Sequence, residues 1–211
     1  MTRIQFLAIA ILILAAAWFG PLPHMASSRF AAHMALHLIL IAAAAPFLAF
    51  AASGTRLEVG LLAVGLLNPV LTSLVELGAV WAWHAPSLHE ASRAYGFVFA
   101  VEQGSFLLAG VLLWLSVLGS EGHRTRRAAL GVFALLLTSM HMTLLGALLI
   151  FARRPLYAHH AAAEGAVGGA LADQQLGGVL MLTIGGVVYL VAGLWLLARV
   201  LEERSRPGTL A

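Results

Sequence analysis

Two histidines four residues apart in an apolar stretch are the residues of this chain best suited to chemistry. His33 and His37 lie within the otherwise apolar residues 31–44, and their spacing places both imidazoles on one face of a helix. Met34 adds a thioether, and imidazole with thioether is a ligand set that suits a soft metal ion. Charged groups at bilayer depth cost about 2.5 kcal/mol or more, so ionisable residues there usually serve a function. The alternative is that each histidine only hydrogen-bonds a neighbouring helix or a water molecule.

Ionisable residues also occur in three later apolar segments. Glu76 and Glu102 fall inside apolar runs, and His141 stands between Met140 and Met142, whose thioethers again favour copper. Each group also has a structural interpretation. Either glutamate could be protonated and bonded to a neighbouring backbone, and His141 could be a packed core histidine.

The segment that begins at Asp173 carries a further group of polar residues. Met181 follows Gln174 by seven residues, which is two turns along nearly the same helical face. Asp173 and Gln174 could position metal-binding imidazoles. They could also cap the helix that follows, because aspartate is favoured at a helix N-terminus and its charge suits that end. Met181 by itself would be a core residue.

The composition is that of an integral membrane protein. Of 211 residues, 61% are hydrophobic and only 10% are charged, whereas a soluble domain carries about 25% charged residues. The twelve basic residues are all arginines and the formal net charge is only +3, so nucleic acid is not an expected partner. The chain has no cysteine, which excludes disulfides, iron–sulfur clusters and thiolate copper sites. A soft-metal site would have to use histidine, methionine and carboxylates.

The apolar segments predict a single all-α domain over residues 1–211, a polytopic membrane helical bundle of about six transmembrane helices. Asn68-Pro69 falls inside the third segment and predicts a kink there. The first segment has a second interpretation as a cleaved secretory signal, because it follows Arg3 and precedes small residues around Ala26. The predicted spans are residues 4–20, 30–51, 59–81, 96–118, 128–151 and 175–200.

The distribution of arginine predicts that both termini face the cytoplasm, because cytoplasmic segments carry the excess of basic residues. In this N-in/C-in topology eight of the twelve arginines are cytoplasmic. These are Arg3, Arg56, Arg124, Arg126, Arg127, Arg199, Arg204 and Arg206. The outer segments hold Arg29, Arg93, Arg153 and Arg154.

This topology places the strongly polar residues of the spans within roughly 15 Å of the outer surface, at 1.5 Å rise per residue. The inner half is predicted to consist of Leu, Val, Ala and Gly. A channel or transporter needs polar groups along a path through both halves of the membrane. The sequence therefore favours a one-sided cup that opens outward. His89, His159 and His160 fall in the outer loops, as bystanders or as an access point for metal.

Five short motifs follow one another in order between about residues 30 and 185. They are His33-Met34-Ala-Leu-His37 with an apolar run to Ala45-Pro46; Trp83-His84-Ala-Pro86-Ser-Leu88; Glu102 with Ser105-Phe106-Leu-Leu-Ala-Gly110 and Trp114; Arg154-Pro-Leu-Tyr157; and Asp173-Gln-Gln-Leu-Gly177-Gly178-Val-Leu-Met181. Together they resemble the CtaG-like cytochrome c oxidase assembly factor family of bacterial integral membrane proteins. The resemblance implies help in assembling the copper centres of terminal oxidases on the outer side of the membrane. It adds His84 to the signature polar positions, and Gln103 departs from the histidine expected after the glutamate.

The leading hypothesis is a non-enzymatic, metallochaperone-like assembly factor, a multi-pass protein of the bacterial inner (plasma) membrane that carries Cu(I). Its expected partners are the lipid bilayer and either cytochrome c oxidase subunits or an outer-compartment copper chaperone; a homodimer is left open. The candidate metal ligands are His33, Met34, His37, His84, His141 and Met181, with Glu102, Asp173 and Gln174 as the residues that position them.

The sequence allows two functions other than copper delivery to be considered. The alternative is a membrane redox protein that binds haem b, with His33 or His37 facing His141 across the bundle as axial ligands. An intramembrane hydrolase is disfavoured, because the chain has neither a HExxH motif nor an evident pair of nucleophile and base.

Overall fold

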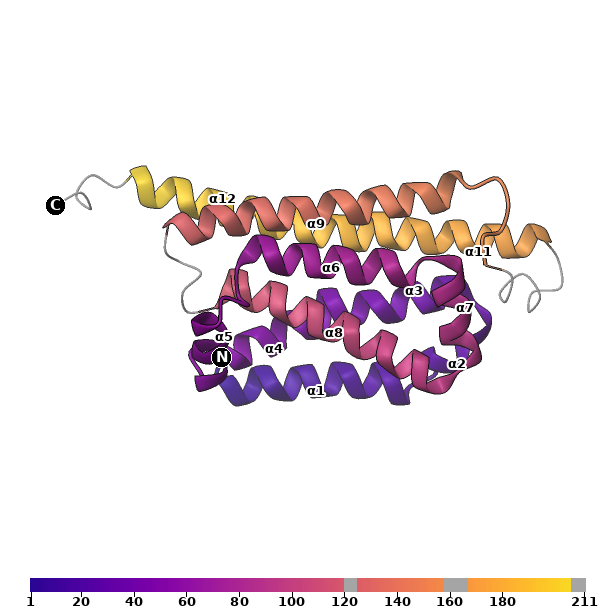
Figure 1. Cartoon of the computed structure of the whole chain (residues 1–211), viewed down its shortest axis with the longest axis horizontal. Helices are drawn as coiled ribbons and strands as arrows, with labels where there is room; N and C mark the ends of the chain where they lie inside the picture. Colours follow the sequence, from indigo (N-terminus) through magenta and orange to yellow (C-terminus); the bar gives the residue numbers. More distant parts are fainter. Residues whose placement is uncertain (120–124, 158–166, 206–211) are drawn as a thin grey trace.

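The computed structural model describes residues 1–119, 125–157 and 167–205, and these fold into a bundle of helices (Figure 1). Four of the described helices are long and apolar enough to cross a membrane: Phe30–Ala52, Gly96–Leu118, Arg127–Phe151 and Gly169–Glu203. A fifth candidate is the pair Arg3–Phe19 and Leu22–Ser28, bent by 44°. The predicted all-α class is confirmed for the described residues, with four to five candidate spans of a polytopic membrane bundle.

The helical elements follow one another with short connections. In chain order they are α1 (Arg3–Phe19), α2 (Leu22–Ser28), α3 (Phe30–Leu38), the π-helix η1 (Ile39–Ala44), α4 (Ala45–Ala52), α5 (Arg56–Ala63), α6 (Pro69–Trp83), α7 (Pro86–Ala94), α8 (Gly96–Leu118), α9 (Thr125–Phe151), α11 (Val167–Leu180), the π-helix η2 (Met181–Gly185) and α12 (Gly186–Ser205).

The prediction of one kinked helix over residues 59–81 as the third span is wrong. The chain leaves α5 after Ala63 and turns at Gly65, whose φ of 74° favours glycine. Asn68 then caps a new helix, because its side-chain oxygen accepts from Val70 N at 3.0 Å. Pro69 is the first residue of α6, where its missing N–H costs nothing. The 15 residues of α6 extend about 23 Å at 1.5 Å per residue, less than a hydrocarbon core of about 30 Å.

Pro46 explains the π-helical segment that follows the two histidines. In η1 the hydrogen bonds run over five residues, as between Ala45 N and Leu40 O. The next bond in this register would need an N–H on Pro46, which proline lacks. The orphaned Ile41 carbonyl instead accepts from Trp114 Nε1 of α8 at 2.8 Å. The bond joins the second and fourth predicted spans at the point where the helix changes register.

Replacing Trp114 with phenylalanine should therefore destabilise the protein. The change leaves the Ile41 carbonyl buried without a donor, which costs about 1–3 kcal/mol. We expect a lower midpoint of thermal unfolding in detergent for Trp114→Phe, whereas Trp195→Phe, at a side chain that is 47% exposed, should leave the midpoint unchanged. An unchanged midpoint for Trp114→Phe would show that water or another donor reaches this carbonyl.

Glycines allow the last helices to pack closely. A Cβ on Gly178 of α11 would lie 2.8 Å from the carbonyl oxygen of Gly146 in α9, and one on Gly186 would lie 2.6 Å from Thr143 Oγ1. Glycine at these two positions therefore lets α11 and α12 approach α9 closely.

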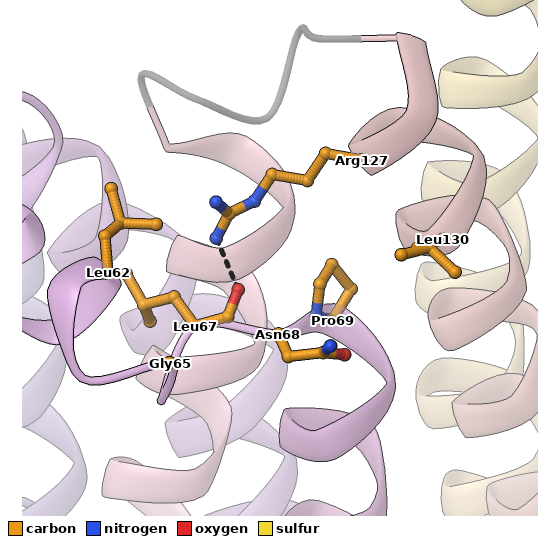
Figure 2. Close-up of a pocket in the computed structure, with 7 residues that line it drawn as sticks. All are labelled: Leu62, Gly65, Leu67, Asn68, Pro69, Arg127 and Leu130. Atoms are coloured by element: carbon orange, nitrogen blue, oxygen red, sulfur yellow. Dashed lines mark hydrogen bonds between the residues drawn. The ribbon is translucent and has the colours of Figure 1, made fainter.

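The bundle has two distinct ends (Figure 1). The amino end of α1, the short helix α5, the start of α9 and the carboxyl end of α12 lie at one end, while α2 and α7 lie at the other. At the first end the Arg127 guanidinium donates to the Leu67 carbonyl in the connection between α5 and α6 (Figure 2). We call the first end the arginine end, after Arg127. The second is the histidine end, because the histidines described next lie near α7.

Candidate metal centre

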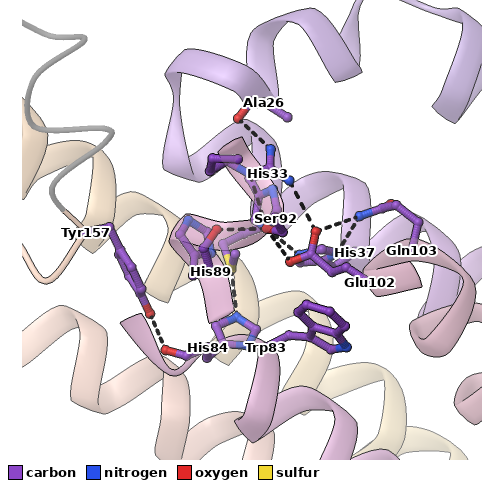
Figure 3. A network of polar contacts seen from close by, with 12 residues as sticks. Ala26, His33, His37, Trp83, His84, His89, Ser92, Glu102, Gln103 and Tyr157 are labelled. Carbon is purple, nitrogen blue, oxygen red and sulfur yellow. Dashed lines mark hydrogen bonds and ion pairs between the residues drawn. The ribbon is translucent and has the colours of Figure 1, made fainter. Parts of the chain in front are cut away.

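His33 and His37 of α3 point at each other in the interior of the bundle. Their Nε2 atoms are 2.6 Å apart, and the two residues are 0% and 3% exposed. Such a distance between neutral rings requires that one nitrogen donates a hydrogen bond to the other. Glu102 Oε1, from α8, lies 3.3 Å from His33 Nε2 and 3.7 Å from His37 Nε2 (Figure 3). The three ligand atoms lie within 4.8 Å of one another and converge as the ligands of one ion do.

The Glu102 carboxylate is held on its other side by α7 and by its neighbour. Arg93 Nη2 lies 3.2 Å from Glu102 Oε2, and Ser92 Oγ donates to Oε1 at 3.2 Å. Gln103 Nε2 contributes a longer bond of 3.4 Å to Oε2. Burial lowers the pKa of Arg93, and the nearby carboxylate opposes this effect. A buried carboxylate with a buried guanidinium and further donors is an ion pair whose members depend on each other.

A second set of donors lies beside His37. His84, at the carboxyl end of α6, donates from Nδ1 to the Val80 carbonyl at 2.6 Å, and its Nε2 lies 3.2 Å from the Met34 sulfur. Because Nδ1 carries the proton, Nε2 of the neutral ring presents a lone pair, which is the arrangement that prepares a histidine for metal binding. Burial also lowers the pKa of His84, so that the neutral ring is favoured.

A small cavity of about 10 Å³ lies among these side chains, enough for roughly one water-sized occupant. Its polar and sulfur-bearing lining residues come from four separate segments and are Met34, His37, His84, Met142 and Met181. Phe106 and three aliphatic residues, Leu38, Ile41 and Val80, complete the wall. The cavity is thus lined by two imidazoles and three thioethers, a donor set that suits Cu(I).

The backbone brings these segments together at irregular places. The π-helix η1 begins two residues after His37, and η2 begins at Met181 itself; such segments are frequent at functional sites. Gly185 in η2 lies against Met142 and Leu38, where an added Cβ would approach to 3.1 and 3.2 Å. Gly177 is tighter, because a Cβ there would be 2.5 Å from the ring of Phe30. Small residues on α11 and η2 therefore let Met181 reach the cavity.

Aromatic rings cover the site at the histidine end. Tyr157 stacks on Phe30 with ring centroids 4.6 Å apart, and the His89 ring lies 4.3 Å from Tyr157 and 4.7 Å from His33. The Tyr157 hydroxyl also donates to the His84 carbonyl at 3.1 Å (Figure 3). These contacts tie the segment after α9 to α3 and α7, so the centre is enclosed.

A model of the cytochrome c oxidase caa3 assembly factor family matches residues 2–203, nearly the whole chain. The chain belongs to this family. No curated protein and no solved structure gives a significant match. The predicted resemblance is therefore confirmed, and the histidine cluster is a feature of a caa3 assembly factor rather than of an isolated bundle.

The structure brings together six of the nine residues singled out in this assembly factor. Glu102 was predicted to position the imidazoles without binding the metal, but its Oε1 atom lies beside the two histidine nitrogens as a possible third ligand. The residues brought together are His33, Met34, His37, His84, Glu102 and Met181.

Asp173 does not cap its own helix, and it does not touch the imidazoles. It lies inside α11, which begins at Val167. Its Oδ2 accepts from Phe30 N at 2.5 Å and from Ala31 N at 3.4 Å, at the start of α3. The carboxylate thus caps the helix that carries both histidines, from a different helix, where its charge also suits the N-terminal end.

An Asp173→Ala substitution should therefore act on stability through α3. Losing a charged acceptor at a helix N-terminus costs about 1–2 kcal/mol, and we expect faster hydrogen exchange at the Phe30 and Ala31 amides. Asp173→Asn keeps an acceptor oxygen and should lose less. Equal protection of both amides in wild type and Asp173→Ala would contradict this role.

Gln174 and His141 also lie outside the cluster. Gln174 Oε1 accepts from Leu156 N at 2.7 Å, so it braces the segment after α9 rather than an imidazole. His141 is 5% exposed, and in the described part of the chain neither ring nitrogen has a hydrogen-bond partner. Its neighbour Met142 lines the cavity instead. His159 and His160 lie outside the described residues.

Several contributing residues were missed or given little weight. Arg93 entered the sequence analysis only as an outer arginine in the topology. It lies in α7, nine residues before Glu102, and contacts that carboxylate. His89 was expected in a loop but lies in α7, 1% exposed and against His33. Gln103, at the position where the family pattern suggested histidine, lies with Nε2 3.4 Å from His37 Nδ1. Met142 could have been recognised from its place beside His141, and it is Met142 that lines the cavity.

Polar side chains also occur away from the histidine end, so the predicted inner half of only Leu, Val, Ala and Gly is wrong. Because α6 starts at Pro69, Glu76 lies in the middle of that helix, where Oε1 accepts from the Tyr189 hydroxyl at 2.5 Å. Nearer the arginine end, Thr72 and Ser116 hydroxyls are 2.9 Å apart. These groups hydrogen-bond between helices, as polar residues in membrane bundles do.

Proposed function

We propose that this caa3 assembly factor holds Cu(I) as a transient cargo at its histidine end and passes it toward a cytochrome c oxidase during maturation of the copper centres. Copper is here a substrate of the protein, delivered and released. The proposal is supported by the convergence of His33, His37 and Glu102 next to a cavity lined by thioethers. Family membership supplies the connection to the oxidase.

The donor atoms fall into two adjoining sets that share His37. His33 and Glu102 offer nitrogen and oxygen, which harder ions accept, while Met34, His84 and Met181 offer sulfur and nitrogen, which suit Cu(I). His37 contacts Glu102 and also lines the cavity. An ion could therefore be exchanged between the sets through His37, and incomplete mixed ligation without cysteine suits a cargo that must leave.

A proton lies where the ion would bind at this site. The 2.6 Å contact between the two Nε2 atoms needs a hydrogen between them, and copper can occupy that place only when the donating ring carries its proton on Nδ1 instead. A neutral imidazole that binds a metal through Nε2 keeps its proton on Nδ1, so loading moves this proton within the ring and releases none to solvent. We expect no proton release when Cu(I) is loaded at about pH 8 in weakly buffered solution containing a pH indicator, and release of one proton per copper would contradict this exchange of tautomers.

The membrane topology proposed for this function has six spans, with α6 and its preceding turn as the third, and with both termini in the cytoplasm of a bacterium. The arginine end then faces inward and the histidine end faces the outer compartment. The whole chain would act there as one domain without catalysing a reaction. Copper would come from or go to a chaperone or an oxidase subunit on that side.

The alternative of a haem b protein is not favoured by the packing. A haem needs a pocket of several hundred cubic ångströms, as other ligand sites do, whereas the cavity at His37 and His84 measures about 10 Å³. His141, the second axial ligand in that hypothesis, does not line this cavity. A Soret band in purified protein would support haem and contradict the copper proposal.

Complementation tests the proposed function. A bacterial strain that lacks the gene would express wild type, His33→Ala or His141→Ala, with membrane levels of each variant compared by immunoblot. We expect His33→Ala to yield oxidase with normal haem but at least about tenfold less copper and activity, whereas His141→Ala should behave as wild type. Full oxidase copper with His33→Ala at equal protein level would overturn the proposal.

A further inference from the structure

A cavity of about 460 Å³ opens at the arginine end, between the connection that joins α5 to α6 and the first turns of α9 (Figure 2). It lies far along the bundle from the histidines and has no part in the metal centre. Its lining residues are Leu62, Gly65, Leu67, Asn68, Pro69, Arg127 and Leu130. We propose that this cavity binds the phosphodiester head and upper acyl chain of an anionic phospholipid.

The charge of the cavity points to an anion. Arg127 is the cationic member of the lining, and the lining includes no aspartate or glutamate. Within the described residues Arg127 has no ion pair: its Nη2 atom donates to the neutral Leu67 carbonyl, and its buried Nε has no partner. Among these residues most of the five N–H donors of the guanidinium therefore have no acceptor, and their fork geometry matches a phosphate.

Asn68 supplies a second donor. Its Oδ1 atom is occupied by the backbone N–H groups of Val70 and Leu71, at 3.0 and 3.3 Å. This cap fixes the side chain, so the amide nitrogen, which only donates, is the group left for a ligand. Figure 2 shows the Arg127 and Asn68 side chains on the same cavity.

The remaining wall favours a lipid over free phosphate. Leu62, Leu67, Pro69 and Leu130 are apolar, and a free phosphate ion gains nothing from such walls. The adjoining helix α5 exposes Leu57 and Val59 by 61% and 62%, as a helix at the membrane surface does. Cationic pockets between membrane helices on the cytoplasmic side are recognised sites for anionic head groups. The cytoplasmic placement rests on the proposed topology, but the binding does not require copper.

Lipid binding to the full-length protein in detergent tests this site. The protein would be mixed with phosphatidylglycerol, phosphatidylcholine or inorganic phosphate, followed by native mass spectrometry and thermal unfolding. We expect wild type to retain phosphatidylglycerol in preference to phosphatidylcholine and to be stabilised by it. An Arg127→Gln substitution, which keeps a donor for Leu67, should lower retention about fivefold, as expected for one interfacial arginine. Arg199→Gln, at the same end, should not.

A second variant separates the site from general charge. Leu130→Trp fills the cavity without changing charge and should also lower retention of phosphatidylglycerol. Equal retention by wild type, Arg127→Gln and Leu130→Trp would overturn the proposal, as would stabilisation by inorganic phosphate to the same degree as by lipid. Copper content measured in the same samples keeps this result separate from the proposed function, since loss of lipid should leave copper at the histidine end unchanged.

Discussion

A Glu102→Ala variant is expected to be the most destabilised single substitution in the histidine cluster. The change removes the only acid from the group and leaves the Arg93 guanidinium, with a side chain only 4% exposed, without its counter-charge. Breaking a buried pair on one side costs about 3–5 kcal/mol, which for a chain of this size corresponds to a fall of about 10 °C in the unfolding midpoint. The measurement is thermal unfolding of the purified protein in detergent.

A double variant that removes both charges gives the control for this prediction. Arg93→Met together with Glu102→Gln removes both charges and keeps similar volumes, so the pair should lose less stability than Glu102→Ala alone. Ser92→Ala, which removes one neutral donor to the carboxylate, should cost only about 1 kcal/mol. The ion-pair account would be wrong if the double variant were as unstable as Glu102→Ala.

Replacing His37 with alanine is expected to weaken copper binding more than any other single histidine change. His37 lies 2.6 Å from His33 at Nε2, 3.7 Å from Glu102, and on the wall of the thioether cavity. Its loss therefore damages both donor sets, and the affinity for Cu(I) should fall by more than about 100-fold, beyond the range typical of groups that only orient a ligand. Competition with a Cu(I) chelator of known affinity measures this directly.

The control is a histidine at similar depth outside the cluster. His141→Ala should leave the affinity within about twofold of wild type, because His141 does not line the cavity. His33→Ala and Met181→Leu should fall between these limits, since each damages one donor set. An affinity for His37→Ala equal to that of His141→Ala would place copper elsewhere on the protein.

The sequence was sufficient for the class of fold and for the pairing of His33 with His37. The helical conformation of an apolar segment, such as the one around His33, can be predicted from the segment itself, because a membrane span must satisfy its own backbone hydrogen bonds. His33 and His37 share a helical face for the same local reason. Gln103 was noted from the resemblance alone, and its contact with His37 could not be derived from spacing.

The failures have two physical causes, which are packing between helices that no periodicity encodes and a local cap that was interpreted as a kink. Asp173 caps α3 across 143 residues, and local preference could suggest only a cap of its own helix. Arg93 reaches Glu102 through the packing of α7 on α8, which no periodicity encodes. Asn68-Pro69 was interpreted as a kink, whereas the asparagine cap and the turn at Gly65 begin a new helix.

The copper site itself is tested most directly by X-ray absorption at the copper edge on the Cu(I)-loaded protein. We expect about one copper per chain, bound by both nitrogen and sulfur. The sulfur contribution should fall in Met181→Leu and stay unchanged in Met140→Leu, because Met140 is 69% exposed and lies outside the cavity. Protein that retains no copper, or a copper spectrum without sulfur that is the same in wild type and Met181→Leu, would contradict a copper site at the histidine end.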